Sequence, residues 1–262
     1  MKTKQKVAII SIIISIIVIS SITILNPQLI DRAFYRMGLQ EQICFPVINE
    51  EFQSDNVTNI VAAGDFGINE NSIKTLKNIQ SSNPEVILML GDLGQSTSKE
   101  WIELSEPMDR NKMYIALGDS DLLERNDYLR YSAITDDYYS FDYQNIHFLA
   151  ISTNEEKNNE FGILSDVIQI DFIKDDLSNA ADDPKTDWIV VFLHHPMYTS
   201  IPNLYSMDLR SLLQPTFDLY GVDLVINGHK HVYERTNPVT FSNTITDNEN
   251  CSYDDPNGQI YL

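Results

Sequence analysis

The chain is poor in basic residues, in cysteine and in repeated sequence. Its 262 residues include 18 Lys and Arg against 38 Asp and Glu, which gives a formal net charge of −20. Such a surface repels nucleic acid, so a nucleic-acid-binding function is not expected. The acidic excess fits a well-solvated surface, or else a surface that faces polyvalent cations. The length is sufficient for one sizeable globular domain.

Only two cysteines occur, Cys44 and Cys251, and neither lies in a pattern of metal ligands or of a nucleophile. An oxidising compartment outside the cytoplasm would permit a disulfide bond between them. Pairing depends on the distance and direction between the two residues in space, so the sequence does not determine it. A Cys44–Cys251 bond, two unpaired thiols and a purely buried role all stay open.

Charged residues are missing from residues 7–25, which are mostly Ile, Val and Leu. A helix over this range is about 28 Å long at ~1.5 Å per residue, close to the ~30 Å hydrocarbon core of a membrane. Three lysines lie in residues 1–6, which predicts a cytoplasmic N-terminus and an extracytoplasmic remainder. We expect an uncleaved signal-anchor. A cleaved signal peptide is the rival, but its apolar core is usually shorter, roughly 7–15 residues, and it ends at an A-x-A-like site that is missing here.

Residues 26–55 are expected to connect this span to a globular domain over residues 56–262. Within the domain, apolar runs typical of buried strands alternate with helical patterns, which predicts the α/β class. The expected strands are 57–63, 86–90, 113–117, 138–143, 146–153, 188–193 and 222–226, and the expected helices are 72–82, 164–181 and 207–219. The last residues, 258–262, resemble the start of a further strand, which suggests a C-terminally truncated domain.

Aspartate or histidine follows five of the expected strands. These residues are Asp65, Asp92, Asp119, His194, and the pair His229 and His231. Open α/β sheets bind ligands at the carboxyl ends of their strands, and glycine beside each aspartate permits a sharp turn there. One Gly-Asp turn alone is usually structural. The repeated pattern indicates a metal site, because carboxylate and imidazole together suit Zn, Mn, Fe or Co.

Six such ligands exceed the need of one ion. A pair of ions about 3.5–4 Å apart, sharing one carboxylate, activates water for in-line displacement at phosphorus. The chain resembles the calcineurin-like metallophosphoesterases, and most closely their purple acid phosphatase branch. The motifs that carry the resemblance are Gly64-Asp65-Phe66-Gly67, Gly91-Asp92, Gly118-Asp119, His194-His195-Pro196-Met197-Tyr198 and Gly228-His229-Lys230-His231-Val232-Tyr233-Glu234-Arg235, together with the central hairpin around Tyr139–Phe148.

This resemblance covers about residues 57–262 and implies a four-layer αββα sandwich of the metallophosphoesterase type, with the dimetal site at the sheet edge. Transferred to this chain, one metal takes Asp65, Asp92 and His231. The other takes Asp92, Asp119, His194 and His229, so that Asp92 bridges. Fe, Mn and Zn are all candidate metals.

The chain departs from the purple acid phosphatase pattern at three positions. Gln95 stands where those enzymes have a tyrosine ligand, so we do not expect the purple colour that iron gives with tyrosine. Asp119 replaces asparagine and can still provide an oxygen ligand. Ser120 replaces a histidine that contacts the phosphoryl group or protonates the leaving group, and a proton donor contributes typically 10²–10⁴-fold. We therefore expect slow turnover of alkyl esters.

Several neighbouring residues have two interpretations. His195 is either a substitute proton donor or a histidine hydrogen-bonded near the site. Tyr198 and Tyr233 either line the substrate pocket or pack in its wall. Asp121 would orient the missing histidine in the family, so its role here is open. His147 is expected to be structural.

The sequence thus predicts a membrane-anchored, extracytoplasmic enzyme that hydrolyses phosphate monoesters, with Asp92, Asp119, Ser120 and His195 in the catalytic set. Hydrolysis of phosphodiesters or nucleotides is a close rival. A degenerate relative that binds metal and phosphate with little catalysis is the alternative from another functional class.

Overall fold

The computed structural model describes residues 58–94, 97–132, 134–157, 160–162, 167–201, 206–241 and 258–262. The predicted span at 7–25, the connector and both cysteines lie outside these ranges. In the described part of the chain, no helix has both the length and the apolar character needed to cross a membrane.

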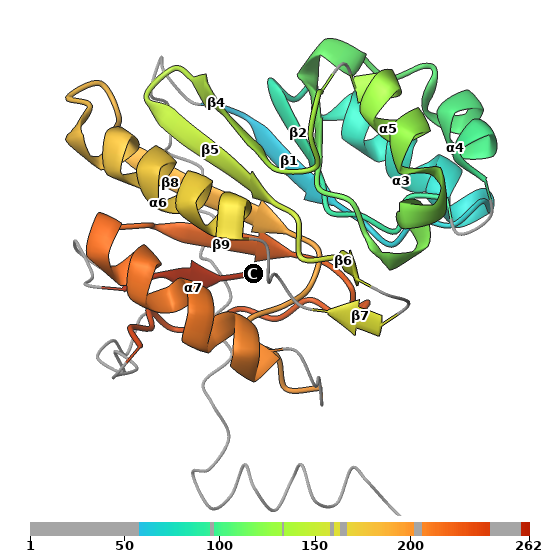
Figure 1. Cartoon of the computed structure of the whole chain (residues 1–262). Helices are drawn as coiled ribbons and strands as arrows, with labels where there is room; N and C mark the ends of the chain where they lie inside the picture. Colours follow the sequence, from blue (N-terminus) through green and yellow to red (C-terminus); the bar gives the residue numbers. More distant parts are fainter. Residues whose placement is uncertain are drawn as a thin grey trace, which may run out of the picture. The chain divides into compact units, whose positions relative to one another are not determined.

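A three-stranded parallel sheet forms the first half of the domain (Figure 1). Its strands run in the order β1 (Ile60–Ala63), β2 (Val86–Met89) and β3 (Met113–Ile115). All four residues of β2 are buried, as expected for the apolar central strand of a parallel sheet. Helices α3 (Glu70–Ser81), α4 (Ser98–Ser105) and α5 (Arg125–Ser132) pack on one face through a core centred on Trp101.

A five-stranded sheet forms the second half, in the order β10-β9-β8-β5-β4. The hairpin of β4 (Tyr139–Tyr143) and β5 (Ile146–Ile151) is antiparallel, and the other neighbours are parallel. Its remaining strands are β8 (Trp188–Leu193), β9 (Leu224–Asn227) and β10 (Ile260–Tyr261). Helices α6 (Val167–Asp182) and α7 (Ser206–Tyr220) cover the outer face, where Leu177, Leu213 and Phe217 meet the strands.

A third apolar cluster lies between the two sheets. It joins Leu88 and Leu90 of the first sheet region to Phe148, Phe192 and Ile226 of the second, and all five side chains are buried. The layers therefore follow as helices, sheet, sheet and helices. The expected α/β class is confirmed.

The structure also contains elements that the sequence pattern did not predict. These are α4, α5, the short helical turns η1 (Arg110–Lys112) and η2 (Asp119–Glu124), and the small hairpin of β6 (Glu155–Lys157) and β7 (Glu160–Gly162). α4 and α5 have eight residues each, which is too few for a helical repeat of apolar residues to be recognised in the sequence. The predicted strands 86–90, 113–117 and 146–153 run one or two residues past the observed ends, because these last residues form the loops that follow. The predicted strands 138–143 and 222–226 begin one or two residues before the observed ones.

Candidate metal centre

The carboxyl ends of the parallel strands in both sheets are tied together by backbone hydrogen bonds. The Asp65 amide donates to the Gly91 carbonyl at 2.9 Å, joining the loops after β1 and β2. The Gly228 amide donates to the His194 carbonyl at 3.0 Å, joining the loops after β8 and β9. His194 Nδ1 lies 2.7 Å from the Leu90 carbonyl, which links the two sheets. The predicted ligands therefore meet at one edge of the domain.

Backbone strain is concentrated at the predicted ligands. Among the described residues, six other than glycine have positive φ, and four of them are Asp65 (54°), Asp92 (50°), His229 (75°) and His231 (54°). Residues other than glycine rarely adopt this backbone conformation. Where they do, they cluster at functional sites, because the surrounding structure holds the backbone in place. The strained backbone turns these four side chains out of the strand direction.

Two glycines allow the loops to approach closely. A Cβ atom at Gly118 would lie 2.3 Å from Asp92 Oδ1, and one at Gly91 would lie 2.7 Å from His194 Nδ1. Both distances are too short for a carbon atom. Glycine is therefore required where the loop after β3 passes Asp92.

One group of ligand atoms comes from Asp65, Asp92 and His194, all within 4.8 Å of one another. Asp65 Oδ2 accepts a hydrogen bond from the His229 amide at 2.9 Å. Asp65 Oδ1 is buried and, within the described part of the chain, has no hydrogen-bond partner. His231 Nε2 lies 3.3 Å from this oxygen. A buried carboxylate oxygen without a hydrogen bond is costly, so this atom fits a bound cation.

A second group comes from Asp119, His194, His195 and His229. His195 Nε2 lies 3.2 Å from Asp119 Oδ1, and His229 Nδ1 lies 3.5 Å from Asp119 Oδ2. Burial, reinforced by the neighbouring imidazoles of His195 and His194, lowers the pKa of His229 to about 4. Burial raises the pKa of Asp119, but the hydrogen bond and charges of the histidines outweigh it, so this pKa lies below its usual value. Neutral imidazole beside ionised carboxylate is the protonation state that metal ligands need.

Ser120 and Asp121 hold the loops of the site. The amide and hydroxyl of Ser120 donate to Asp92 Oδ1 at 2.9 and 3.0 Å. Asp121 is fully buried and accepts from the Leu93 and Gly118 amides at 3.0 and 2.8 Å. Burial raises the pKa of Asp121 to about 6. Asp121, whose role the sequence left open, joins the loop after β2 to the loop after β3.

The observed groups differ from the predicted ligand sets in several ways. His194 contributes to both groups, Asp92 contributes to the first group only, and His195 joins the second. His231 approaches Asp65 but is in neither group, and its side chain is 62% exposed. Gln95 lies outside the described residues. The individual ligand assignments stay predictions.

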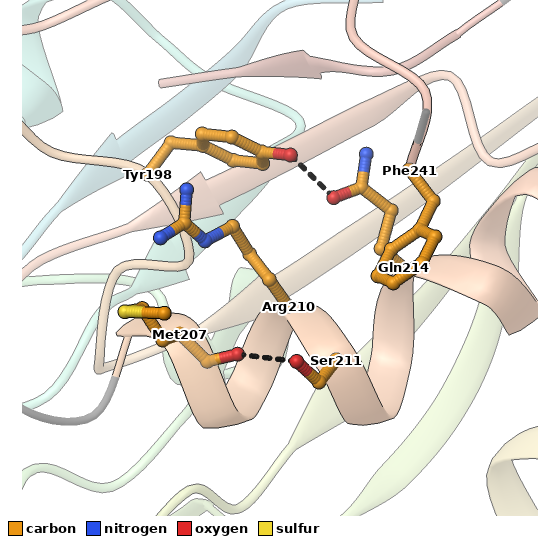
Figure 2. Close-up of a pocket in the computed structure, with 6 residues that line it drawn as sticks. All are labelled: Tyr198, Met207, Arg210, Ser211, Gln214 and Phe241. Atoms are coloured by element: carbon orange, nitrogen blue, oxygen red, sulfur yellow. Dashed lines mark hydrogen bonds between the residues drawn. The ribbon is translucent and has the colours of Figure 1, made fainter. Parts of the chain in front are cut away.

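The two tyrosines predicted at the substrate lie in different surroundings. Tyr233 is 80% exposed. Tyr198 lines a cavity of about 290 Å³ beside α7, with its hydroxyl donating to Gln214 at 2.5 Å and the Arg210 guanidinium over its ring (Figure 2). None of the residues that line this cavity is a predicted metal ligand. The role of both tyrosines in substrate binding stays a prediction.

His147 lies on β5, belongs to neither ligand group, and has a structural environment. Its Nδ1 is 2.8 Å from Asp142 and its Nε2 is 2.9 Å from Asp176, so it joins the β4–β5 hairpin to α6. Burial lowers its pKa, but the two carboxylates outweigh burial and raise the pKa above its usual value. The structural role predicted for His147 is confirmed.

Comparison with known proteins agrees with this arrangement. The family model for calcineurin-like phosphoesterases matches residues 58–233, more than half of the chain. The chain therefore belongs to the calcineurin-like phosphoesterase family.

Its relatives include purple acid phosphatases. Purple acid phosphatase 23 of Arabidopsis thaliana is 22% identical over 283 residues, which cover 88% of this chain and 58% of the relative. Purple acid phosphatase 15 of the same plant is 24% identical over 251 residues, covering 78% and 43%. The chain thus spans about half the length of these curated relatives. The solved structure of purple acid phosphatase PPD1 from yellow lupin seeds shares the fold, with a TM-score of 0.56, 18% identity, and coverage of 79% of this chain and 44% of that one.

Proposed function

We propose that this chain hydrolyses phosphate monoesters at a centre that binds two metal ions. The observation that carries the proposal is the pair of ligand groups at one sheet edge, which share His194 and together offer three carboxylates and three imidazoles. Such a mixed set suits Zn, Mn or Fe. Two ions bound there would activate water for attack at phosphorus and neutralise charge on the departing oxygen.

Each residue has a distinct part in this proposal. Asp92 belongs to the group with Asp65 and His194 and would bind the ion held there, with Ser120 fixing its carboxylate. Asp65 and His231 complete one side, and Asp119, His194 and His229 the other. Asp121 positions the two loops through their amides.

Ser120 limits the range of substrates. Its hydroxyl already donates to Asp92, and a hydroxyl is a poor acid. Leaving groups that need a proton, such as alkoxides, should therefore depart slowly. Aryl phosphates should react faster, because their leaving oxygen is stable without protonation.

The proposal includes a location on the extracytoplasmic face of a membrane. The apolar run at 7–25 and the lysines before it support a signal-anchor. Protease added to intact cells should then remove the domain. Full protection of the domain in intact cells, with digestion after lysis, would contradict this location.

The test of the function uses the full-length chain with an aryl phosphate monoester and the matching diester, in the presence of Mn, Zn, Fe or no metal. We expect metal-dependent turnover that is lost in Asp92→Asn and kept in Asp171→Asn, a matched change on the exposed face of α6. The ratio of monoester to diester turnover then identifies the substrate class. Absence of turnover in folded protein holding two ions would contradict the enzyme proposal.

A second candidate function is binding of metal and phosphate with little hydrolysis. The Ser120 hydroxyl favours this candidate, because it already donates to Asp92. Ser120→His separates the two candidates. If hydrolysis rises strongly in this variant at unchanged metal content, the wild-type chain has a working centre that lacks a proton donor. If hydrolysis stays absent, the chain is a binding protein.

A further inference from the structure

His195 is the residue of the site that the family pattern does not use as a ligand. Its ring centroid lies 4.5 Å from that of His229 and 5.0 Å from that of His194, and the latter two are also 5.0 Å apart. The three imidazoles therefore surround one small volume. Asp119 faces the same volume through both of its oxygens.

Three contacts in this group are close to the spacing of a four-coordinate metal site. Four ligands about 2.05 Å from one ion, arranged as a tetrahedron, lie about 3.3 Å apart. Asp119 Oδ1 lies 3.2 Å from His195 Nε2, and its other oxygen, Oδ2, lies 3.5 Å from His229 Nδ1. His229 Nδ1 and His194 Nε2 are 3.2 Å apart. All four ligand atoms lie within 4.8 Å of one another, so an ion would draw the remaining pairs closer together.

The orientation of His195 is set by Thr153, which is buried. His195 Nδ1 lies 2.9 Å from Thr153 Oγ1, and the His195 amide donates to the same oxygen. This contact directs Nε2 toward Asp119. His194 is arranged alike, with Nδ1 on the Leu90 carbonyl and Nε2 in the site. Metal-binding histidines usually have their other ring nitrogen fixed in this way.

We propose that His195 is a metal ligand, and that Asp119, His194, His195 and His229 form a zinc-preferring site of three imidazoles and one carboxylate. Because His194 Nε2 can bind only one ion, the neighbouring ion is left with Asp65, Asp92 and His231. That set is richer in oxygen and suits Mn or Fe. This inference rests on the metal centre proposed above.

The test measures coordination directly in the full-length chain. Zn²⁺ affinity is determined by competition with a chromophoric chelator, and the visible spectrum of Co²⁺ reports coordination number, because four-coordinate Co²⁺ absorbs far more strongly than six-coordinate Co²⁺. We expect His195→Gln to weaken Zn²⁺ binding at least tenfold and to reduce the Co²⁺ absorption. His147→Gln, which removes a buried histidine outside the site, should change neither.

Thr153 provides a second pair of variants. Thr153→Val removes the oxygen that orients His195 and should weaken Zn²⁺ binding tenfold or more, whereas Thr153→Ser keeps the oxygen and should bind as the wild type does. These variants decide the matter if His195→Gln does not fold.

The possible results separate this inference from the proposed function. Two bound ions in the wild type, with affinity and Co²⁺ spectrum unchanged in His195→Gln or Thr153→Val, would overturn the role of His195 and leave the metal centre standing. A wild-type chain that binds no ion would overturn both.

Discussion

Substitution of Gly118 tests whether the site depends on the close packing of its loops. In Gly118→Ala the new Cβ atom would meet Asp92 Oδ1 at 2.3 Å and the Asp92 amide nitrogen at 2.2 Å. Relief of this overlap requires a shift of about 1 Å. Ligand distances in metal sites hold within about 0.2 Å, so the displaced Asp92 carboxylate could no longer hold its ion. We expect the variant to retain at most one ion per chain.

The same substitution should lower stability by about 1–3 kcal/mol, as overpacking usually does. For a domain of this size, that corresponds to a decrease in Tm of roughly 2–12 °C. Gly221→Ala is a matched control, because Gly221 has φ of +68° but no atom lies within 4 Å of its would-be Cβ. Gly221→Ala should lower the free energy of unfolding by about 1–2 kcal/mol through backbone strain alone.

The two variants are compared by thermal unfolding and by elemental analysis after gel filtration. Both should unfold at lower temperature, but only Gly118→Ala should lose metal. If Gly118→Ala keeps two ions with wild-type affinity, the reasoning from loop packing is wrong.

Three further predictions concern single side chains. Ser120→Ala removes one hydrogen bond to Asp92 but leaves the amide bond, so metal affinity should fall roughly fivefold, equivalent to about 1 kcal/mol, and an unchanged affinity would contradict this role. The pKa of His147 is raised in the folded chain. The contacts of protonated His147 with its two carboxylates therefore stabilise the fold fully below about pH 6.5, and this stabilisation is lost as the pH rises through the pKa of the folded state. His147→Gln should abolish that part of the dependence of Tm on pH, and parallel curves for the two proteins would refute the assignment. Trp101→Ala should lower the unfolding free energy in urea by about 3–5 kcal/mol, because the ring is fully buried, and a loss below about 1 kcal/mol would contradict its place in the core.

Strands of the α/β domain were predictable where an apolar run reflects burial on both faces. The sequences of β2 and β8 are apolar throughout, which predicts buried strands. Helices α4 and α5 were not predictable. The sequence of α5 has little apolar periodicity of its own. α4 is held chiefly by Trp101, which packs against Phe66 and two tyrosines. Tertiary contacts define such short helices, and a local pattern does not reveal them.

The sequence predicted which residues follow the strands and so contribute to the site. Parallel strands end at one edge of their sheet, so Asp65 had to lie near Asp92, and His194 near His229. The approach of His194 to the two aspartates depends on the packing of one sheet against the other, which the sequence pattern does not show. The direction of each side chain was not predictable, because it depends on left-handed backbone at residues other than glycine and on contacts such as Thr153 with His195. Asp121 was also beyond prediction, since its role is to accept amides from two loops.

The most direct test of the central claim is a titration of metal-free protein with Mn²⁺ or Zn²⁺, in which bound ions and hydrolysis of an aryl phosphate are measured together. The account predicts that two ions bind per chain and that turnover rises with the second. It also predicts that Asp92→Asn binds fewer ions and shows no turnover. Hydrolysis that proceeds without metal, or that is unaffected in Asp92→Asn, would contradict it.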